Sequence, residues 1–401
     1  MDVIYLDFRK AFDTVPHQRL LYKLESYGIS GPIISWINSF LSDRKQRVFV
    51  NGHFSEWADV LSGIPQGSVL GPTLFLIFIN DLPETIANLV KIFADDTKVY
   101  SIINDNQDIE SLQNDLDNLA EWSNKWKLGF NAKKCKSMHI GRNNPEHKYT
   151  MLDVTTGVRT EIQQVVEEKD LGVTFQNDLK FNKHIATCVK KANRMIGIIR
   201  RAFTSLDKGM FLTLYKSMIR PYLEYATAVW SPHLKKDIFM IENTQRRATK
   251  IVKEIKDWPY EDRLRFLGLP TLIYRRTRND MIQVFKIMNN INNVDKDLFF
   301  TINSQSTTRG HSLKICKKQN RLNIRAHAFS QRVVYTWNDL PKKCIQSRDV
   351  NSFKTNLNMN CKNHPDKFDY TSCAPNATTS TRYAATRGQY YPRDTERPAD
   401  R

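Results

Sequence analysis

The stretch that most constrains the fold is an acidic doublet, Asp95-Asp96, set between two short runs of residues that favour β-structure. Residues 89–92 and 97–100 form these runs, so the pattern predicts a strand, a tight turn that carries the carboxylates, and a second strand. Adjacent like charges repel, and a fold that keeps them together offsets the repulsion with a cation, basic neighbours or water. Mg²⁺ suits this role, because it takes a few carboxylate oxygens and leaves positions for substrate phosphates. On its own, such a doublet is more often a solvated turn.

A third carboxylate, Asp7, directly follows the apolar run of residues 3–6, which predicts another strand. A carboxylate at the end of a buried strand is well placed to join a metal site. The strand begins two residues after Met1, which suggests that a preceding segment is missing.

Hydrophobic periodicity and turn signals predict the other elements. We expect helices over residues 17–42 with a break at 28–31, a hairpin around Asn51-Gly52, a small-residue loop over 61–68, helices over 69–82 and 105–127, a strand over 137–140, a strand pair over 169–175, and helices throughout 184–293. The loop of residues 61–68 would let backbone approach a base or a phosphate, although it is equally compatible with turn chemistry alone. Residues 361–401 lack periodicity and predict a disordered tail.

Charge is unevenly distributed along the 401 residues, whose net charge is +18. Residues 1–140 hold 14 basic and 17 acidic side chains, whereas residues 184–280 hold 20 basic and 9 acidic ones. An acidic part followed by a basic part suggests a metal-dependent site and a surface that holds a polyanion. The alternative is a solvated basic helical face.

The six cysteines lack the paired spacing of a disulfide framework, which favours reduced thiols and an intracellular location, in the nucleus or the cytoplasm. Cys361, His364 and Cys373 lack a fourth ligand and regular spacing, so we do not expect zinc there. The longest apolar run, residues 74–79, is too short to cross a membrane, and no leader opens the chain.

Three segments in this order resemble the signature motifs of reverse transcriptases. They are residues 5–13 (YLDFRKAFD), 63–68 (GIPQGS) and 93–96 (FADD). The Ala-Asp-Asp version, together with Trp230-Ser231-Pro232 and residues 245–248 (QRRA), is similar to the non-LTR, LINE-type retrotransposons near the jockey-like group. The resemblance covers residues 1–250 well and reaches more loosely to 360.

The resemblance implies RNA-directed DNA synthesis with an RNA template, a DNA primer, deoxynucleoside triphosphates and two Mg²⁺ ions. It implies that Asp7, Asp95 and Asp96 hold the metals. Lys134 matches a lysine that protonates pyrophosphate. Phe8, Phe12, Gln66 and Gly67 match substrate-binding positions, with Phe12 under the sugar and Gln66 at the nucleotide and template. Leu171-Gly172 resembles the primer grip.

The implied fold is α+β, a right-hand polymerase palm with a helical thumb. Residues 1–183 would be the palm with residual fingers, 184–293 the thumb, 294–360 a basic C-terminal extension and 361–401 the tail. In the family a fingers segment precedes the first acidic motif, so we expect the fingers to be largely missing here, along with the basic clamp on the triphosphate that they supply.

Two alternatives remain beside the enzyme. One is a truncated, catalytically inactive RNA/DNA-binding protein derived from a retrotransposon, whose basic region still holds duplexes. The weaker one is a genomic relic without a stable product.

Overall fold

The computed structural model of the chain describes residues 1–153, 156–303, 311–362 and 364–369. The chain forms two compact units, Met1–Leu179 (unit 1) and Lys180–Arg401 (unit 2). Both helices and sheet are present, as the predicted α+β class requires. Within the described ranges, no helix combines the length and the apolar character that crossing a bilayer demands.

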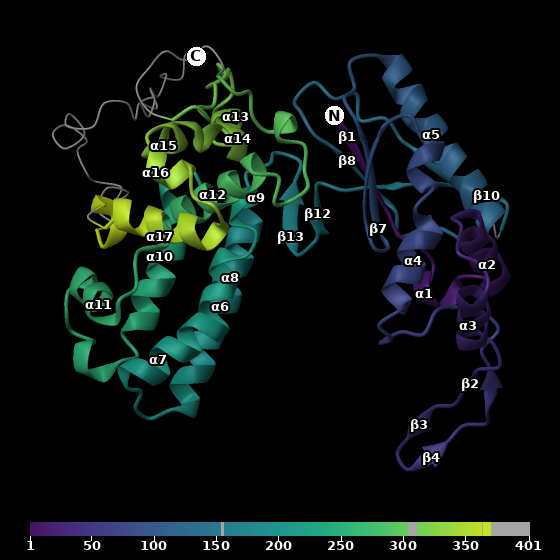
Figure 1. Ribbon diagram of the computed structural model, residues 1–401, viewed down its shortest axis with the longest axis horizontal. Helices are drawn as coiled ribbons and strands as arrows, with labels where there is room; N and C mark the ends of the chain where they lie inside the picture. The colour runs from purple at the N-terminus through teal and green to yellow at the C-terminus, as the bar shows by residue number, and fades with distance from the viewer. Residues whose placement is uncertain (154–155, 304–310, 363, 370–401) are drawn as a thin grey trace, which may run out of the picture. The chain divides into compact units, whose positions relative to one another are not determined.

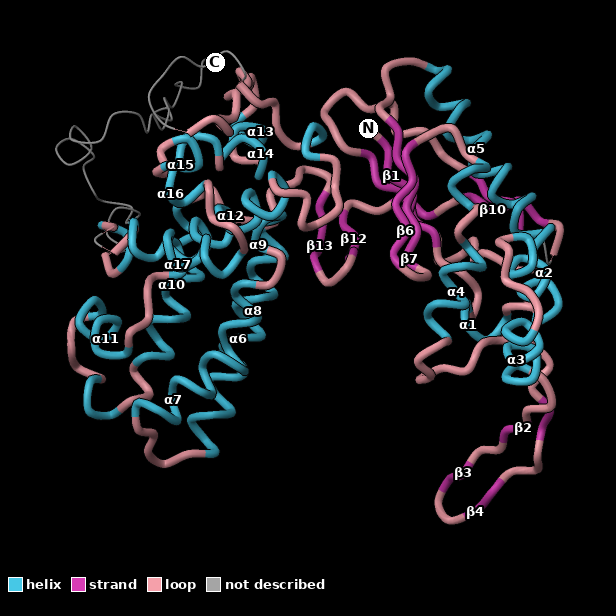
Figure 2. The backbone as a smooth tube through the Cα atoms, in the orientation of Figure 1, coloured by secondary structure: helices cyan, strands magenta, loops and turns pink. Residues whose placement is uncertain are grey.

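Unit 1 is built on a five-stranded sheet with the order β11-β8-β1-β7-β6 (Figure 2). Its strands are β1 (Asp2–Leu6), β6 (Leu89–Phe93), β7 (Asp96–Ser101), β8 (Lys136–His139) and β11 (Gln163–Gln164). β1 lies at the centre, antiparallel to both β7 and β8, while β11 runs parallel to β8. The predicted strand pair around the acidic doublet is therefore confirmed as β6 and β7.

Helices of unit 1 gather on one side of this sheet (Figure 1). They are α1 (Ala11–Thr14), α2 (His17–Ser26), α3 (Pro32–Leu41), α4 (Gly71–Ile79) and α5 (Asn106–Trp126). α5 begins with a capping box, in which the Asp105 carboxylate accepts from the Asp108 backbone N–H and the Asp108 carboxylate accepts in return. Its apolar stripe, which includes Leu112, Leu116 and Leu119, is fully buried, so the predicted helix is core.

A two-stranded arm extends beyond α3 (Figure 1). It consists of two short strand pairs, β2 (Lys45–Gln46) with β5 (Ala58–Asp59), and β3 (Phe49–Val50) with β4 (His53–Phe54). Asn51 and Gly52 have φ of 51° and 85°, the left-handed conformation that a tight hairpin turn needs, which confirms the predicted hairpin. Large apolar side chains stay exposed on this arm, namely Val48, Phe49, Val50, Phe54 and Trp57. The Arg47 guanidinium lies over two of the rings, 3.8 Å from the Phe54 centroid and 4.5 Å from that of Trp57.

Two further strand pairs complete unit 1. β9 (Thr150–Asp153) pairs with β10 (Val158–Glu161), and β12 (Glu167–Asp170) pairs with β13 (Val173–Gln176). Ion pairs fasten the β12–β13 hairpin to the central sheet, since Lys98 of β7 binds Asp170 and Lys136 of β8 binds Glu168 at 2.6 Å. The predicted strand pair over residues 169–175 is confirmed.

Unit 2 is helical. Its longer helices are α6 (Asn182–Ala202), α7 (Lys208–Leu214), α10 (Lys235–Thr249), α11 (Tyr260–Leu267), α12 (Leu272–Met288) and α17 (Val350–Asn360). Shorter ones are α8 (Arg220–Glu224), α9 (Thr227–Trp230), α13 (Asn323–Ala326), α14 (Phe329–Arg332), α15 (Val334–Asn338) and α16 (Lys342–Ile345). The predicted helical region over residues 184–293 thus extends from α6 through α12.

Apolar side chains of the described residues that follow α12 share a core with this helix. Phe285 of α12 stacks on Phe353 of α17 with ring centroids 4.3 Å apart, and Trp337 of α15 is fully buried in the same cluster. The chain continues into a 3-10 turn, Pro365–Lys367, whose Lys367 carbonyl accepts from the Thr271 backbone N–H at 2.9 Å. The predicted disordered tail begins at residue 361, so this packed turn corrects its first part, whereas Cys373 and residues 370–401 lie outside the described residues.

Candidate active site

The three predicted metal-binding carboxylates come together at one end of the central sheet. Leu6 pairs with Thr97 at the end of the β1–β7 ladder, so Asp7 follows β1 at the end of the sheet where Asp96 begins β7. Phe93 pairs with Asp96, which leaves Ala94 and Asp95 as the two residues of the turn. Ala94 has φ 52°, a conformation that glycine adopts more readily, so the turn is held under some backbone strain.

The three carboxylates influence one another's ionisation. Burial raises the pKa of Asp7, the Lys134 ammonium opposes that rise, and the Asp95 charge adds to it. Burial also raises the pKa of Asp96, and the charges of Asp95, Asp170 and Asp7 raise it further. The site therefore holds an excess of negative charge that a cation would relieve.

The chemistry of the donor set fits a hard divalent cation in part. Asp7 Oδ1 is buried and has no hydrogen-bond partner, a costly state for a carboxylate oxygen that a metal ion would satisfy. Over the described ranges, however, no three His, Cys, Asp or Glu side chains are grouped closely enough to form a ready-made metal cluster. Mg²⁺ is commonly held by only one or two carboxylates plus substrate phosphates, so an incomplete protein cage is compatible with it.

Lys134 lies on a turn that is fixed against the end of β1. The Asn131 backbone N–H donates to the Asp7 carbonyl at 2.7 Å, and the Lys134 N–H donates back to the Asn131 carbonyl at 2.8 Å. The Lys134 ammonium stands 3.9 Å from Asp7 Oδ1 and is largely exposed to solvent. The predicted catalytic lysine thus lies beside the predicted metal ligands, free to meet a substrate.

A pocket of about 450 Å³ adjoins the acidic turn. Its lining residues are Lys10, Ala11, Phe12, Asp13, Pro65, Gln66, Gly67, Pro72 and Asp95. Three of the predicted substrate-binding residues, Phe12, Gln66 and Gly67, therefore share one pocket with a predicted metal ligand. Phe12 is held by stacking on Phe75 of α4, with ring centroids 4.6 Å apart.

The loop of residues 61–68 is docked tightly on the start of the chain. The Ile64 N–H donates to the Phe12 carbonyl at 2.7 Å, and the Gly63 N–H donates to the Val15 carbonyl at 2.8 Å. Gly63 has φ 92°, and a Cβ there would lie 2.7 Å from the Asp13 Cα, so only glycine fits. The loop of residues 61–68 therefore does more than reverse the chain direction. Its Gly63 permits close backbone contact with the motif of residues 5–13.

Two polar residues of this site were not assigned a role from the sequence. Asp13 accepts from the Gln66 side-chain amide at 2.9 Å and so orients it. His17 Nε2 is hydrogen-bonded to the Gly63 carbonyl at 2.8 Å, which anchors the loop. Asp13 lies within the first motif, directly after the predicted sugar-binding Phe12. This position is the sequence feature that could have assigned Asp13 to the site.

Phe8, predicted as a substrate-binding position, has its side chain in the core. The residue is buried at 6% exposure, and its ring stacks on Phe130 with centroids 4.5 Å apart. Ile4, Leu6 and Phe8 follow the period of two that sends alternate side chains of a strand to one face, and all three belong to the core of unit 1. Phe8 therefore stabilises the end of β1 instead of lining the pocket.

The predicted primer grip, Leu171-Gly172, forms the tip of the β12–β13 hairpin. Leu171 and Gly172 have φ of 45° and 83°, and Leu171 is 42% exposed. The preceding residue, Asp170, is close enough to raise the pKa of Asp96, so the base of this tip stands within electrostatic reach of the acidic turn.

Comparison of the sequence with known proteins finds a family match over nearly all of unit 1. Residues 3–175 match a sequence family described as "Reverse transcriptase (RNA-dependent DNA polymerase)". The chain is 30% identical to the RNA-directed DNA polymerase from mobile element jockey of Drosophila melanogaster over 263 residues, 61% of this chain and 28% of that protein. It is 31% identical to the jockey polymerase of Drosophila funebris over 280 residues, 65% of this chain and 29% of the relative. A probable RNA-directed DNA polymerase from transposon X-element of Drosophila melanogaster is 27% identical over 262 residues, 62% of this chain and 28% of that protein. The chain thus spans less than a third of the length of these relatives.

Proposed function

We propose that this chain carries a reverse transcriptase domain of the jockey-like, non-LTR retrotransposon class and is the catalytic part of an RNA-directed DNA polymerase. The family uses divalent metal ions and has a palm-type fold. Its substrates in this proposal are an RNA template, a DNA primer and deoxynucleoside triphosphates, and it acts inside the cell, in the nucleus or the cytoplasm. The observation that carries the proposal is the meeting of Asp7, Asp95 and Asp96 at one end of the sheet, beside the pocket of Phe12 and Gln66.

In this proposal Asp7, Asp95 and Asp96 hold two Mg²⁺ ions. When bound, such ions lower the pKa of a primer 3′-hydroxyl and neutralise charge on the transferred phosphate. Asp7 contributes its buried Oδ1, which has no hydrogen-bond partner, and Asp95 reaches the site from the strained turn. Lys134 stands where it can give its proton to the leaving pyrophosphate, 3.9 Å from Asp7.

The pocket next to these carboxylates receives the incoming nucleotide. Phe12, fixed by Phe75, lies under the sugar, and its bulk disfavours a 2′-hydroxyl. Gln66 is held by Asp13, so its amide meets the nucleotide in one orientation. Leu171-Gly172 supports the primer strand, and the helices of residues 184–293 act as the thumb.

Primer extension on an RNA template with Mg²⁺ tests the proposal. The wild-type chain should extend a labelled DNA primer, and Asp95→Asn should lower the rate by at least about 100-fold because metal-centred charge stabilisation is lost. Asp59→Asn, which changes an exposed carboxylate on β5, is the matched control and should extend the primer at the wild-type rate. Equal extension by wild type and Asp95→Asn would contradict the assigned site.

The second candidate is a nucleic-acid-binding protein that does not polymerise. The 20 basic against 9 acidic side chains of residues 184–280 favour it, together with the absence, among the described residues, of a ready-made cluster of three metal-binding side chains. It predicts that duplex binding persists in Asp95→Asn while no primer is extended by any variant, wild type included.

A further inference from the structure

A second pocket, of about 390 Å³, lies within unit 2, far along the chain from the carboxylates. Its lining residues are Pro270, Tyr274, Arg275, Arg278, Asn358 and Lys367. Three of these six carry a positive charge and none carries a negative one. The walls come from three elements. They are α12 together with Pro270, which precedes its N-cap residue, then α17, and the 3-10 turn Pro365–Lys367.

Hydrogen bonds hold the walls of this pocket in place. Thr271, the N-cap residue of α12, donates its backbone N–H to the Lys367 carbonyl at 2.9 Å and its hydroxyl to the Asp366 carbonyl at 2.6 Å. Arg278 Nε donates to Asn358 Oδ1 at 2.8 Å, which joins α12 to α17. The Arg278 side chain and the Lys367 backbone are therefore each held by hydrogen bonds, and the Lys367 ammonium donates to the Lys362 carbonyl at 3.3 Å.

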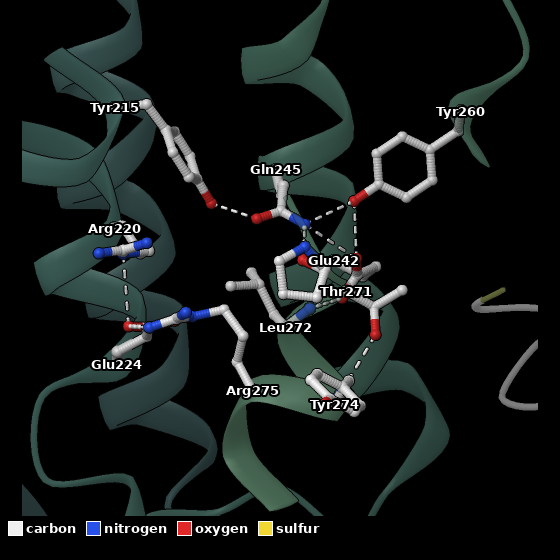
Figure 3. A network of polar contacts seen from close by, with 11 residues as sticks. Tyr215, Arg220, Glu224, Glu242, Gln245, Tyr260, Thr271, Leu272, Tyr274 and Arg275 are labelled. Atoms are coloured by element: carbon white, nitrogen blue, oxygen red, sulfur yellow. Dashed lines mark hydrogen bonds and ion pairs between the residues drawn. The ribbon is translucent and has the colours of Figure 1, made fainter. Parts of the chain in front are cut away.

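Positive charge exceeds negative charge around the pocket. Figure 3 shows Arg220 and Arg275 converging on a single carboxylate, Glu224; Arg275 Nη2 lies 2.8 Å from Glu224 Oε2 and Arg220 Nε lies 3.5 Å from it. Burial lowers the pKa of Arg278, and the charge of Arg275, three residues earlier on α12, lowers it further. Glu224 thus pairs with two guanidinium groups, while Arg278 and Lys367 add two further cations to the pocket lining. On the adjoining turn, the Asp366 carboxylate stands 3.9 Å from His364 Nδ1.

Like charges gathered in this way are stable when an anion offsets them. A guanidinium presents a planar fork of N–H donors that matches two phosphate oxygens, and a lysine adds a point charge. Pro270 and the Tyr274 ring supply an apolar wall. The pocket is larger than a phosphate ion alone, which leaves room for an attached sugar.

We propose that this pocket binds a phosphate group from the backbone of a bound nucleic acid, with Arg278 and Lys367 as its principal contacts. The inference rests on the proposed function only in its choice of a polynucleotide as the source of the phosphate. Because the site lies in unit 2, it works without metal and without the carboxylates of unit 1.

Duplex binding by the full chain in the presence of EDTA tests the proposal. The anisotropy of a fluorescent RNA–DNA duplex gives Kd over a series of salt concentrations. Arg278→Gln should weaken binding by about five- to tenfold at about 0.1 M salt and reduce the slope of log affinity against log salt by about one, because one phosphate contact is lost. Arg278→Lys should retain the slope, because it keeps the positive charge. Its affinity should still fall, because lysine lacks the planar fork of guanidinium N–H donors that binds two phosphate oxygens. Lys367→Gln should lower duplex affinity and the salt slope as Arg278→Gln does. It keeps the proposal testable if the arginine variant fails to fold.

Lys253→Gln is the matched control, since it removes one charge from an exposed position of unit 2 outside the pocket. If Arg278→Gln, Lys367→Gln and Lys253→Gln lower affinity and slope equally, the pocket has no special role and the proposal is overturned.

In a separate experiment, the melting temperature of the protein is measured as inorganic phosphate or a mononucleotide is added. If these anions raise the melting temperature of wild type but not of Arg278→Gln, while Arg278→Gln keeps the wild-type slope of log duplex affinity against log salt, the pocket binds a free anion. In that outcome the polynucleotide assignment is wrong. Because duplex binding is measured in EDTA, a failure of primer extension leaves this result intact.

Discussion

At the scale of the residue, Asp7 shows how the site trades stability for chemistry. Its Oδ1 is buried without a hydrogen-bond partner, and its neighbours Asp95 and Asp96 carry the same charge. Without a cation this arrangement costs free energy, because burial and like charges both disfavour the ionised carboxylate. The same features make the site receptive to a divalent ion.

The pH dependence of stability follows from the raised pKa values of Asp7 and Asp96, whose ordinary value is 3.8. A carboxyl group with a raised pKa in the folded state holds its proton more tightly there, so its contribution favours folding at low pH and is lost as pH rises from 3.8 to the raised value. In EDTA we expect Asp7→Asn to raise Tm by about 1–3 °C at neutral pH and to flatten the part of the pH profile above the ordinary pKa of 3.8. Thermal melts over a pH series measure this.

Added Mg²⁺ supplies the control for that experiment. It should stabilise the wild-type protein and have little effect on Asp7→Asn, since ligand binding to the folded state raises Tm. Asp59→Asn should follow the wild type throughout. An Asp7→Asn profile identical to that of wild type, with and without Mg²⁺, would show that the buried oxygen is satisfied in another way.

Gly63 offers a prediction about backbone packing. In Gly63→Ala the new Cβ meets the Asp13 backbone at 2.7 Å, in a conformation of φ 92° that alanine resists. We expect the free energy of unfolding to fall by about 3 kcal/mol, from strain and a forced shift of the loop. Urea denaturation measures the change. Gly28→Ala separates the two causes, because Gly28 has φ 83° but open space around it, and it should cost only about 1 kcal/mol. Equal losses in the two variants would refute the close approach.

At the scale of the element, the β12–β13 hairpin depends on charged contacts with the sheet. Lys98 is 28% exposed and Asp170 is 10% exposed, so their ion pair is partly desolvated. Without Lys98, the Asp170 charge would be left uncompensated near Asp96. We expect Lys98→Met to raise KM for the primer more than it lowers kcat, because the hairpin tip at Leu171-Gly172 loses its fixed position. Steady-state primer extension separates the two parameters.

A double-mutant cycle with Lys98→Met and Asp170→Asn checks that this effect passes through the pair. The coupling in the free energy of unfolding should be about 1–2 kcal/mol. The pair Lys136–Glu168, 2.6 Å apart and further from the tip, is the comparison, and its disruption should change primer KM less. Additive losses for Lys98 and Asp170 would show that the two side chains act independently.

Elements with a strong local signal were predictable from the sequence. The capping box and apolar stripe of α5, the Asn51-Gly52 turn and the strands around Asp95 each carry their own pattern. Residues 311–345 fold into four- and five-residue helices, too short for a periodic pattern to show, and their packing on α12 depends on tertiary contacts such as those of Trp337. The Asp13–Gln66 hydrogen bond spans 53 positions, and local patterns carry no record of such pairs. The burial of Phe8 follows from the alternation of Ile4, Leu6 and Phe8 along β1 and just past its end, a local pattern that the sequence contains.

At the scale of the whole molecule, negative and positive charge fall mainly in different units. We expect RNA–DNA duplex affinity to fall about 10²- to 10³-fold between about 50 and 200 mM salt, as several phosphate contacts to basic side chains release counterions. Anisotropy titrations measure the slope. Asp95→Asn in EDTA should give the same slope as wild type, whereas replacing cations of unit 2 should reduce it. A slope that changes with Asp95 instead would place the main nucleic-acid contact in unit 1.

The exposed arm of β2 to β5 has a consequence for the colloidal behaviour of the protein. Phe49, Phe54 and Trp57 leave an apolar surface on short strands with open edges, which are prone to pair with another copy. The net charge of +18 keeps copies apart at low ionic strength, and salt screens that repulsion. Concentrated protein should therefore scatter more light as salt rises, so that the conditions that release nucleic acid during purification are those that bring the arms of separate molecules together.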